Sequence, residues 1–149
     1  MNLWIFSSKT VTNIEVAKER LLWGFWDKRI AEKKKWNWRA FITLYNKIEP
    51  FDIVLFQRAY TGEIHALGIV KKTYYDDETP TFPGEEKDVI FPWKVSFCSL
   101  IFSKKPFITH FVKKEDYVDG FGIGKLSEFE LRRVLREIQK QANIDLNIG

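Results

Sequence analysis

The stretch IVLFQRAYTGEIHALGIV, residues 53–70, holds two apolar runs on either side of Thr61-Gly62-Glu63. Because glycine readily adopts the positive φ that a tight connection needs, this stretch predicts a β-hairpin. Both arms are apolar at nearly every position, whereas a strand with one solvated face alternates apolar and polar residues. We therefore expect two central strands of a closed or covered sheet, with the hairpin as the floor of a small β-barrel.

Length and the few potential metal ligands limit the class of protein. At 149 residues the chain has the size of one domain, and we expect residues 1–149 to form a single α+β domain. The only cysteine, Cys98, excludes an internal disulfide, and His65 and His110 lie too far apart in sequence to have metal-ligand spacing. We expect neither a metal nor another cofactor.

The chain starts with MNLWIF, without the basic region and long apolar region of a signal peptide. No apolar run approaches the roughly 18 residues that a membrane span needs. We therefore expect a soluble, cytoplasmic protein that does not enter a membrane.

The composition is basic and rich in aromatic residues. A formal net charge of +4 and a pI near 9.1 permit a polyanionic partner but do not distinguish a nucleic-acid binder from an ordinary basic protein. Aromatic residues make up 16% of the chain, with six Trp and thirteen Phe, which exceeds what a core of this size needs. We expect some of these rings to face a ligand.

The N-terminal segment predicts a strand, a helix and a loop. Residues 3–6 form a short apolar run. Thr12 and Glu15 have the spacing of a capping box, and apolar residues then recur at helical spacing, so we expect a helix over residues 13–20. Residues 21–27 are irregular around Gly24, and we expect a loop there.

Residues 28–39 (KRIAEKKKWNWR) hold six basic side chains with Trp36 and Trp38 among them. Cations beside flat rings suit a phosphate backbone with neighbouring bases. The candidate phosphate contacts in this segment are Lys33, Lys34, Lys35 and Arg39. The alternative is a solvated helix that two tryptophans anchor to the core.

The segment after the hairpin predicts a long loop over residues 71–88, and loops of this length in compact domains tend to be functional or disordered. Its rings Tyr74, Tyr75 and Phe82 are candidates to reach a site. Residues 89–102 follow as a strand that Pro92 interrupts.

The C-terminal part combines a glycine-rich segment with a helix. Residues 119–125 place three glycines before Lys125, but the spacing is not that of a nucleotide-hydrolysing P-loop, so we expect at most an arm that brings Lys125 to a phosphate. Ser127 and Glu130 form a second capping box, and the apolar spacing after it predicts a helix to about Gln141.

The order of these segments resembles the EVE domain and the related YTH domains of the PUA-like superfamily. The resemblance covers residues 3–135 and depends on the order and spacing of short motifs. These are LWIFSS (3–8), LLWG (21–24), PFDIVLF (50–56), GEIHALGIV (62–70), FPWKVSF (91–97) and GIGKL (122–126).

The resemblance implies a PUA-like β-barrel of mixed strands surrounded by helices. YTH domains bind N6-methyladenine, and some EVE-like domains are DNA-specificity modules of modification-dependent restriction systems of the McrB type. We therefore expect a nucleic-acid-binding module that reads a flipped, methylated base, either N6-methyladenine or a methylated cytosine. Its partners would be DNA or RNA and a separate nuclease or restriction subunit, and the chain itself a monomer or weak dimer.

The resemblance also assigns residues to the site. It places Trp23 in the aromatic cage with the Gly24 amide facing the base, and Lys125 at a phosphate. The polar groups at the base edge are Ser7, Ser8 and Asn13. Three rings compete for the second cage wall: Tyr74, Tyr75 and Phe82. Lys9 and Leu126 depart from the YTH pattern, which leaves the identity of the base open.

Three alternatives remain at this stage. One is a PUA-like RNA-binding protein without modification selectivity, in which residues 28–39 dominate binding. A second takes Trp23 as a core residue under the barrel lid. The third is an enzyme, but the sequence offers no nucleophile with a base, no paired catalytic carboxylates and no metal cluster, so we expect a binding protein.

Overall fold

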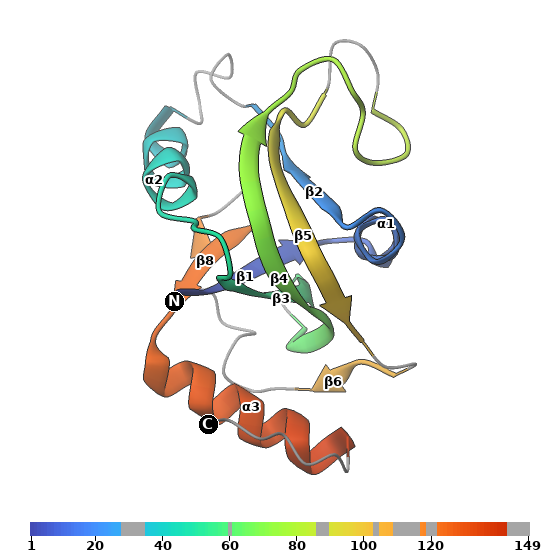
Figure 1. Ribbon diagram of the computed structural model, residues 1–149, viewed down its shortest axis with the longest axis vertical. Coiled ribbons are helices and arrows are strands. Elements are labelled where there is room, and N and C mark those ends of the chain that lie inside the picture. Colours follow the sequence, from blue (N-terminus) through green and yellow to red (C-terminus); the bar gives the residue numbers. More distant parts are fainter. Residues whose placement is uncertain are drawn as a thin grey trace.

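The computed structural model describes residues 1–27, 35–59, 61–85, 90–102, 105–108, 117–118 and 122–142. The elements are, in chain order, β1 (Leu3–Ser8), α1 (Val11–Arg20), β2 (Leu22–Phe25), α2 (Lys35–Tyr45), β3 (Ile53–Arg58), β4 (Glu63–Tyr75), β5 (Trp93–Ile101), β6 (Phe107–Ile108), β7 (Tyr117–Val118), β8 (Ile123–Leu126) and α3 (Glu128–Ala142). Figure 1 shows a sheet with α1 and α2 at its flanks and α3 below it. The fold class is α+β, as the sequence predicts.

The strands form one sheet with the order β2-β5-β4-β3-β1-β8-β7, and β6 pairs with β4. β1 and β3 pair in parallel, and the other neighbours are antiparallel. Among the described strands, β2 and β7 end this path without pairing with each other, so the expectation of a closed barrel was wrong. Closure requires each strand to pair on both sides, and end strands of four and two residues offer few backbone groups for that.

Two irregularities bend the sheet. The register between β3 and β4 shifts between Phe56 and Gln57, and the register between β4 and β5 shifts around Val70. Such β-bulges increase the local twist of a sheet. In Figure 1, β1 accordingly runs across the long strands β4 and β5.

The predicted hairpin is confirmed as β3 and β4. Each arm lies between two other strands, so both are central. Gly62 at the turn has φ 72°, the left-handed conformation for which glycine is suited. The second arm is longer than expected: the sequence predicts a loop from Lys71, but residues 73–75 pair with residues 93–95 and extend β4 to Tyr75.

Side chains of the central strands alternate between two cores on opposite faces of the sheet. The aromatic core lies between the sheet and helices α1 and α2; its fully buried members include Trp4, Phe6, Phe41 and Phe56. The aliphatic core lies between the sheet and α3 and includes Leu3, Ile5, Leu55, Val134 and Ile138. Much of the unusual aromatic content therefore serves packing.

The first predicted capping box was wrong. α1 begins at Val11, and its N-cap is Thr10, which has extended backbone angles and makes no side-chain capping bond. Glu15 lies too far into the helix to cap it and instead pairs with Lys18, with 2.9 Å between Oε1 and Nζ. The helix therefore starts two residues before the position that Thr12 predicts.

The second predicted capping box is confirmed. The Ser127 amide donates to the Glu130 carboxylate at 3.2 Å, and the Glu130 amide donates to the Ser127 hydroxyl at 3.2 Å. These two bonds satisfy amides that the first turn of a helix leaves without partners. α3 accordingly begins at Glu128.

The predicted loop over residues 21–27 was also wrong in part, because residues 22–25 form β2. Leu22 to Phe25 pair with Ser96 to Trp93 of β5. The preference of a glycine-containing segment for irregular structure is overridden here by tertiary pairing, since β5 would otherwise expose unpaired backbone groups along this side.

Asp52, directly before β3, fixes the N-terminal strand. Its carboxylate accepts hydrogen bonds from the Asn2 amide (2.8 Å), the Trp4 indole N–H (2.9 Å) and the Glu49 amide (2.9 Å). Burial by itself raises the pKa of Asp52, but the hydrogen bonds stabilise the carboxylate and together hold the pKa below its ordinary value of 3.8. This buried carboxylate therefore joins β1 to the turn before β3.

Candidate functional site

Trp23, the central residue of the predicted base pocket, lies in the aromatic core. β2 pairs it with Val95 of β5, and it is only 4% exposed. Its indole lies 5.3 Å from the ring of Phe56 and 6.3 Å from that of Phe6, measured between centroids. The indole is therefore covered in this conformation of the protein.

The cover over Trp23 is Phe82. The two ring centroids lie 4.9 Å apart with an interplanar angle of 73°, an edge-to-face contact. Phe82 is 5% exposed and belongs to residues 76–85, which we name the cover loop. The aromatic wall that faces Trp23 thus comes from a loop and not from the sheet.

Tyr74 and Tyr75, the other candidates for the second cage wall, lie at the end of β4. Tyr75 packs against Trp93 with 4.9 Å between centroids. The carbonyl of Tyr74 accepts a hydrogen bond from the Tyr45 hydroxyl at 3.2 Å. Of the three candidate rings, the structure places only Phe82 against Trp23.

A carboxylate and a guanidinium hold the cover loop in place. The Glu85 carboxylate accepts hydrogen bonds from the backbone amides of Thr81 and Phe82. It also accepts one from the Phe91 amide at 2.6 Å. From α1, the Arg20 guanidinium donates to the Thr81 carbonyl at 2.8 Å. The position of Phe82 therefore depends on one charged group within the loop, Glu85, and one on α1, Arg20.

Lys94 of β5 supports the same loop from below. It is 1% exposed, and its ammonium donates to the Thr79 carbonyl at 2.7 Å and to the Thr81 hydroxyl. Burial lowers the pKa of Lys94 from its ordinary value of 10.5, while the charges of Glu85 and Asp76 act in the opposite direction. A buried lysine of this kind is not evident from the sequence pattern of β5.

Gly24, predicted to present its amide to a base, packs closely against the cover loop. A Cβ at this position would lie 2.8 Å from the Phe91 carbonyl oxygen and 2.8 Å from the Thr81 hydroxyl oxygen. The absence of a side chain at Gly24 therefore permits the loop to approach β2.

Ser7 and Ser8 lie on opposite faces of β1, because successive side chains of a strand alternate. Ser8 follows Trp4 and Phe6 toward the aromatic core, where its hydroxyl accepts a hydrogen bond from the Thr10 amide at 3.2 Å. The Ser7 hydroxyl accepts a hydrogen bond from the buried Gln57 side chain at 3.1 Å. Only Ser8 has its side chain on the face of the sheet that carries Trp23.

Asn13 lies in the first turn of α1, half-buried. Within the described part of the chain its amide has no hydrogen-bond partner. It therefore has both a donor and an acceptor available for a ligand at the end of β1.

The phosphate candidates that the structure describes, Lys125 and Arg39, lie on different elements. Lys125 of β8 lies opposite Trp4 in the antiparallel pairing of β8 with β1, and its ammonium lies 5.8 Å from the centre of the Trp4 indole. Trp4 is four residues from Ser8 along β1, which corresponds to about 13 Å of strand. Arg39 is exposed on α2. Lys33 and Lys34 lie outside the described residues, as does the side chain of Lys35.

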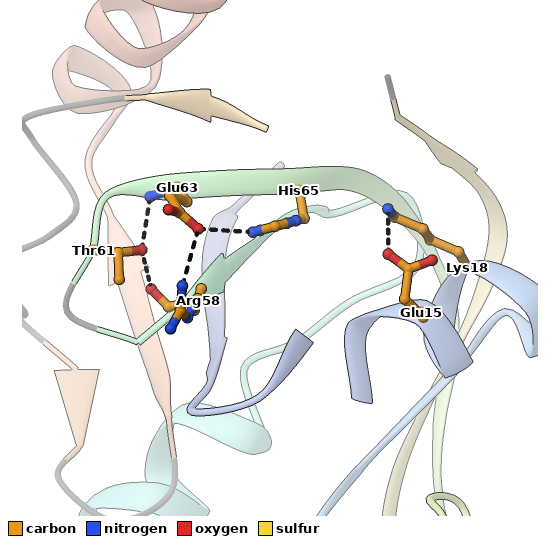
Figure 2. Close-up of polar contacts among 6 residues, drawn as sticks. All are labelled: Glu15, Lys18, Arg58, Thr61, Glu63 and His65. Atoms are coloured by element: carbon orange, nitrogen blue, oxygen red, sulfur yellow. Dashed lines mark hydrogen bonds and ion pairs between the residues drawn. The ribbon is translucent and has the colours of Figure 1, made fainter. Parts of the chain in front are cut away.

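Sequence reasoning missed one basic residue beside Ser8. The parallel pairing of β1 with β3 places Arg58 directly opposite Ser8, and its side chain is 49% exposed. Figure 2 shows Glu63 between Arg58 and His65. The Glu63 Oε2 lies 3.9 Å from Arg58 Nη1 and 3.2 Å from His65 Nε2. Because this adjacency comes from strand pairing, no local motif could have predicted it.

The described residues contain no group of three or more histidine, cysteine, aspartate or glutamate side chains placed to hold a metal ion. In the same residues, no helix has both the length and the apolar composition needed to cross a membrane.

No protein-family model matches the chain. Over 143 residues it is 49% identical to the uncharacterized protein MJ1369 of Methanocaldococcus jannaschii, an alignment that covers 95% of this chain and 92% of that protein. The chain belongs to the MJ1369 family. An identity of this level over nearly the full length of both chains means that MJ1369 shares the fold described above.

Solved structures similar to this MJ1369-family protein include the MmI1 YTH domain, with a TM-score of 0.61 and 16% identity over 96% of this chain and 98% of that chain. A Pseudomonas putida protein solved by structural genomics aligns with a TM-score of 0.53 and 8% identity over 91% and 98%. The YTH domain of the Zygosaccharomyces rouxii MRB1 protein, in complex with N6-methyladenosine RNA, aligns with a TM-score of 0.48 and 9% identity over 99% and 88%. The likeness to the MmI1 domain confirms a YTH-like fold, whereas membership of the EVE family stays a prediction.

Proposed function

We propose that this MJ1369-family protein is a nucleic-acid-binding module that reads a flipped, methylated base, either N6-methyladenine or a methylated cytosine. The observation that carries the proposal is Trp23 beneath the loop-borne Phe82, in a fold shared with a YTH domain over 96% of the chain. YTH domains bind N6-methyladenine, and the proposal extends this binding activity to the chain because its sequence resembles theirs.

In this proposal, the base enters when the cover loop moves and the Phe82 ring leaves the indole of Trp23. Stacking a base on an aromatic ring contributes about 1 to 3 kcal/mol. This offsets the few kcal/mol that unstacking costs in a duplex. Burying one methyl carbon adds only about 0.8 kcal/mol, so selectivity for the methylated base also requires polar contacts.

The polar contacts come from the region where β1 ends and α1 begins. The Asn13 amide and the Ser8 hydroxyl read the edge of the base, and the Gly24 amide becomes accessible when the loop leaves it. Ser7 supports the end of β1 in this proposal, because its side chain lies on the other face and its amide donates to the Gly122 carbonyl at 2.8 Å. Tyr74 and Tyr75 would contact a neighbouring nucleotide.

Basic side chains around the molecule bind the phosphates in this proposal: Lys33, Lys34, Lys35, Arg39, Lys125 and also Arg58. DNA or RNA is the partner. The chain acts as a monomer or weak dimer that recognises the base, and a separate nuclease or restriction subunit performs any cleavage.

The burial of Trp23 favours a second candidate, a PUA-like RNA-binding protein without modification selectivity. Such a protein binds through its basic surface while the indole stays in the core. Its affinity falls steeply with salt and is indifferent to the base, since phosphate contacts release counterions but carry no base identity.

The test is a binding titration with short single- and double-stranded DNA and RNA that contain N6-methyladenine, 5-methylcytosine or no modification. We expect wild type to prefer a modified strand by about tenfold, and Asn13→Ala to remove this preference. Thr12→Ala, at the exposed neighbouring position of α1, is the matched control. Trp23→Phe should weaken the preference while retaining an aromatic core residue. Equal affinity of the wild type for modified and plain strands would eliminate the reader and leave the second candidate.

A further inference from the structure

A groove outside the Trp23 region separates the start of the chain from α3. It has a volume of about 750 Å³ and lies between the N-terminal residues, the end of β8 and the outer face of α3. In Figure 1, the N-terminus and β8 lie above the first turns of this helix. None of the aromatic contacts of the candidate base site involves a residue of this groove.

The apolar part of the groove is aliphatic. Val134 and Ile138 of α3 point into the aliphatic core, and Leu131 packs at its edge. Leu135 belongs to neither core, yet it lines the groove together with Leu131. Among the described residues, α3 therefore presents Leu135 outside both cores, one turn from Leu131 at the edge of the aliphatic core.

The charged part of the groove is predominantly cationic. Its described lining includes Lys125, Arg132 and Arg136, and Glu128 is the one carboxylate among these described residues. The Glu128 carboxylate forms an ion pair with Arg132, with 3.0 Å between Oε1 and Nη2. Within the described residues, Lys125 and Arg136 have no carboxylate partner. An incoming ligand thus meets a positive field beside leucine side chains.

The spacing of these groups indicates the kind of ligand. Arg132 and Arg136 are four residues apart, as are Leu131 and Leu135, so cations and leucines form parallel stripes along α3. A second helix with leucines and carboxylates at the same spacing matches both stripes, as in helix-in-groove recognition. The guanidinium fork suits carboxylates in particular.

A nucleic acid matches this surface less well. The described lining of the groove contains no aromatic ring on which a base could stack, and base–aromatic stacking supplies much of the affinity for single strands. Phosphates would pair with the arginines but leave the leucines exposed to water.

We propose that the groove between the N-terminus, β8 and α3 is a docking site for an acidic amphipathic helix of a partner protein. The inference depends on the groove and not on base reading at Trp23; Lys125 is the one residue that it shares with the phosphate contacts proposed above.

The test uses two fluorescein-labelled 18-residue peptides with leucines at helical spacing, one with glutamates beside the leucines and one with lysines in their place. Fluorescence anisotropy should show that wild type binds the acidic peptide at least about tenfold more tightly than the basic one. The variant Arg132→Glu/Arg136→Glu should reverse this preference. Arg133→Glu/Lys140→Glu makes the same change of net charge on α3 outside the groove and should keep the wild-type preference.

Three outcomes overturn the proposal. The first is equal or absent binding of both peptides to a wild type whose circular dichroism shows a folded protein. The second is that wild type binds an oligothymidylate probe but not the acidic peptide, and that only the groove variant loses binding of the oligothymidylate. The third is that sedimentation shows a dimer for wild type and for the control variant but a monomer for the groove variant. That result would assign the groove to a second copy of the chain. None of these results bears on selectivity for a modified base.

Discussion

The ring of Phe82 meets the indole of Trp23 edge to face, with centroids 4.9 Å apart. Phe82 belongs to the cover loop, and Trp23 belongs to β2, an end strand of the sheet. Because hydrogen bonds to Glu85, Arg20 and Lys94 hold the loop, this contact defines a closed state. If the protein reads a base with Trp23, Phe82 competes with that base for the same ring.

Weakening this contact is therefore expected to favour ligand entry. Phe82→Leu keeps an apolar side chain but removes the ring, and should lower the free energy of unfolding by about 1 to 2 kcal/mol. It should also raise the association rate of a modified oligonucleotide several-fold, measured by stopped-flow fluorescence. Phe51→Leu, at a position that is 70% exposed, serves as the control for ring loss alone. An unchanged rate in Phe82→Leu would show that the loop does not limit entry.

The buried ammonium of Lys94 should determine how rigid the cover loop is. Lys94→Met removes its bonds to Thr79 and Thr81, and amide hydrogen exchange of Thr79, Thr81 and Phe82 should become about tenfold faster. Exchange in β3, which this substitution does not touch, provides the internal reference.

The same residue predicts an alkaline pH dependence. Since burial lowers the pKa of Lys94, the native state binds this proton less tightly than the unfolded chain. The free energy of unfolding therefore rises with pH from the native pKa up to the ordinary value of 10.5. Urea titrations across this range should show the rise in wild type and a smaller rise in Lys94→Met. Identical slopes in the two proteins would assign the dependence to other groups.

Asp52 predicts how the free energy of unfolding changes at acid pH. Its native pKa is held below 3.8, so its contribution to stability is complete above the unfolded pKa and is lost as the pH falls through the native pKa. Asp52→Asn should lower the free energy of unfolding at neutral pH by about 2 kcal/mol. Its stability should also fall less steeply than that of wild type below about pH 4. Parallel acid profiles would contradict the role of this carboxylate.

Gly24 predicts a steric effect. In Gly24→Ala the new Cβ meets the Phe91 carbonyl oxygen at 2.8 Å, and this backbone atom cannot move away without distorting the segment that leads into β5. We expect a loss of about 2 kcal/mol in the free energy of unfolding. Gly84→Ala is the comparison, because its Cβ meets nothing within 4 Å and only its φ of 86° opposes the substitution, at about 1 kcal/mol. A larger loss in Gly84→Ala would refute the close approach at Gly24.

Several parts of the fold were predictable because they depend on neighbouring residues. Gly62 between two apolar runs is sufficient to specify the β3–β4 hairpin, and Ser127 with Glu130 specifies the start of α3. The α+β class and the YTH-like fold also follow from the order of local motifs. The barrel expectation failed because closure depends on the lengths of strands at the two ends of the sheet.

The candidate site was predictable only in part. The sequence resemblance pointed to Trp23 and left three rings as candidates for the opposite wall, and only the folding of the cover loop places one of them, Phe82, against Trp23. The supporting lysine, Lys94, and the arginine beside Ser8, Arg58, carry no local signal.

The sequence by itself determined the turns, the helix caps and the apolar strands, since these are set by interactions within a few residues. Tertiary structure alone decided that Ser8 and not Ser7 shares a face with Trp23, and that Arg58 lies opposite Ser8. The physical reason is that a shift of one residue in strand register exchanges the faces of every side chain. That register is fixed by pairing between strands about fifty residues apart.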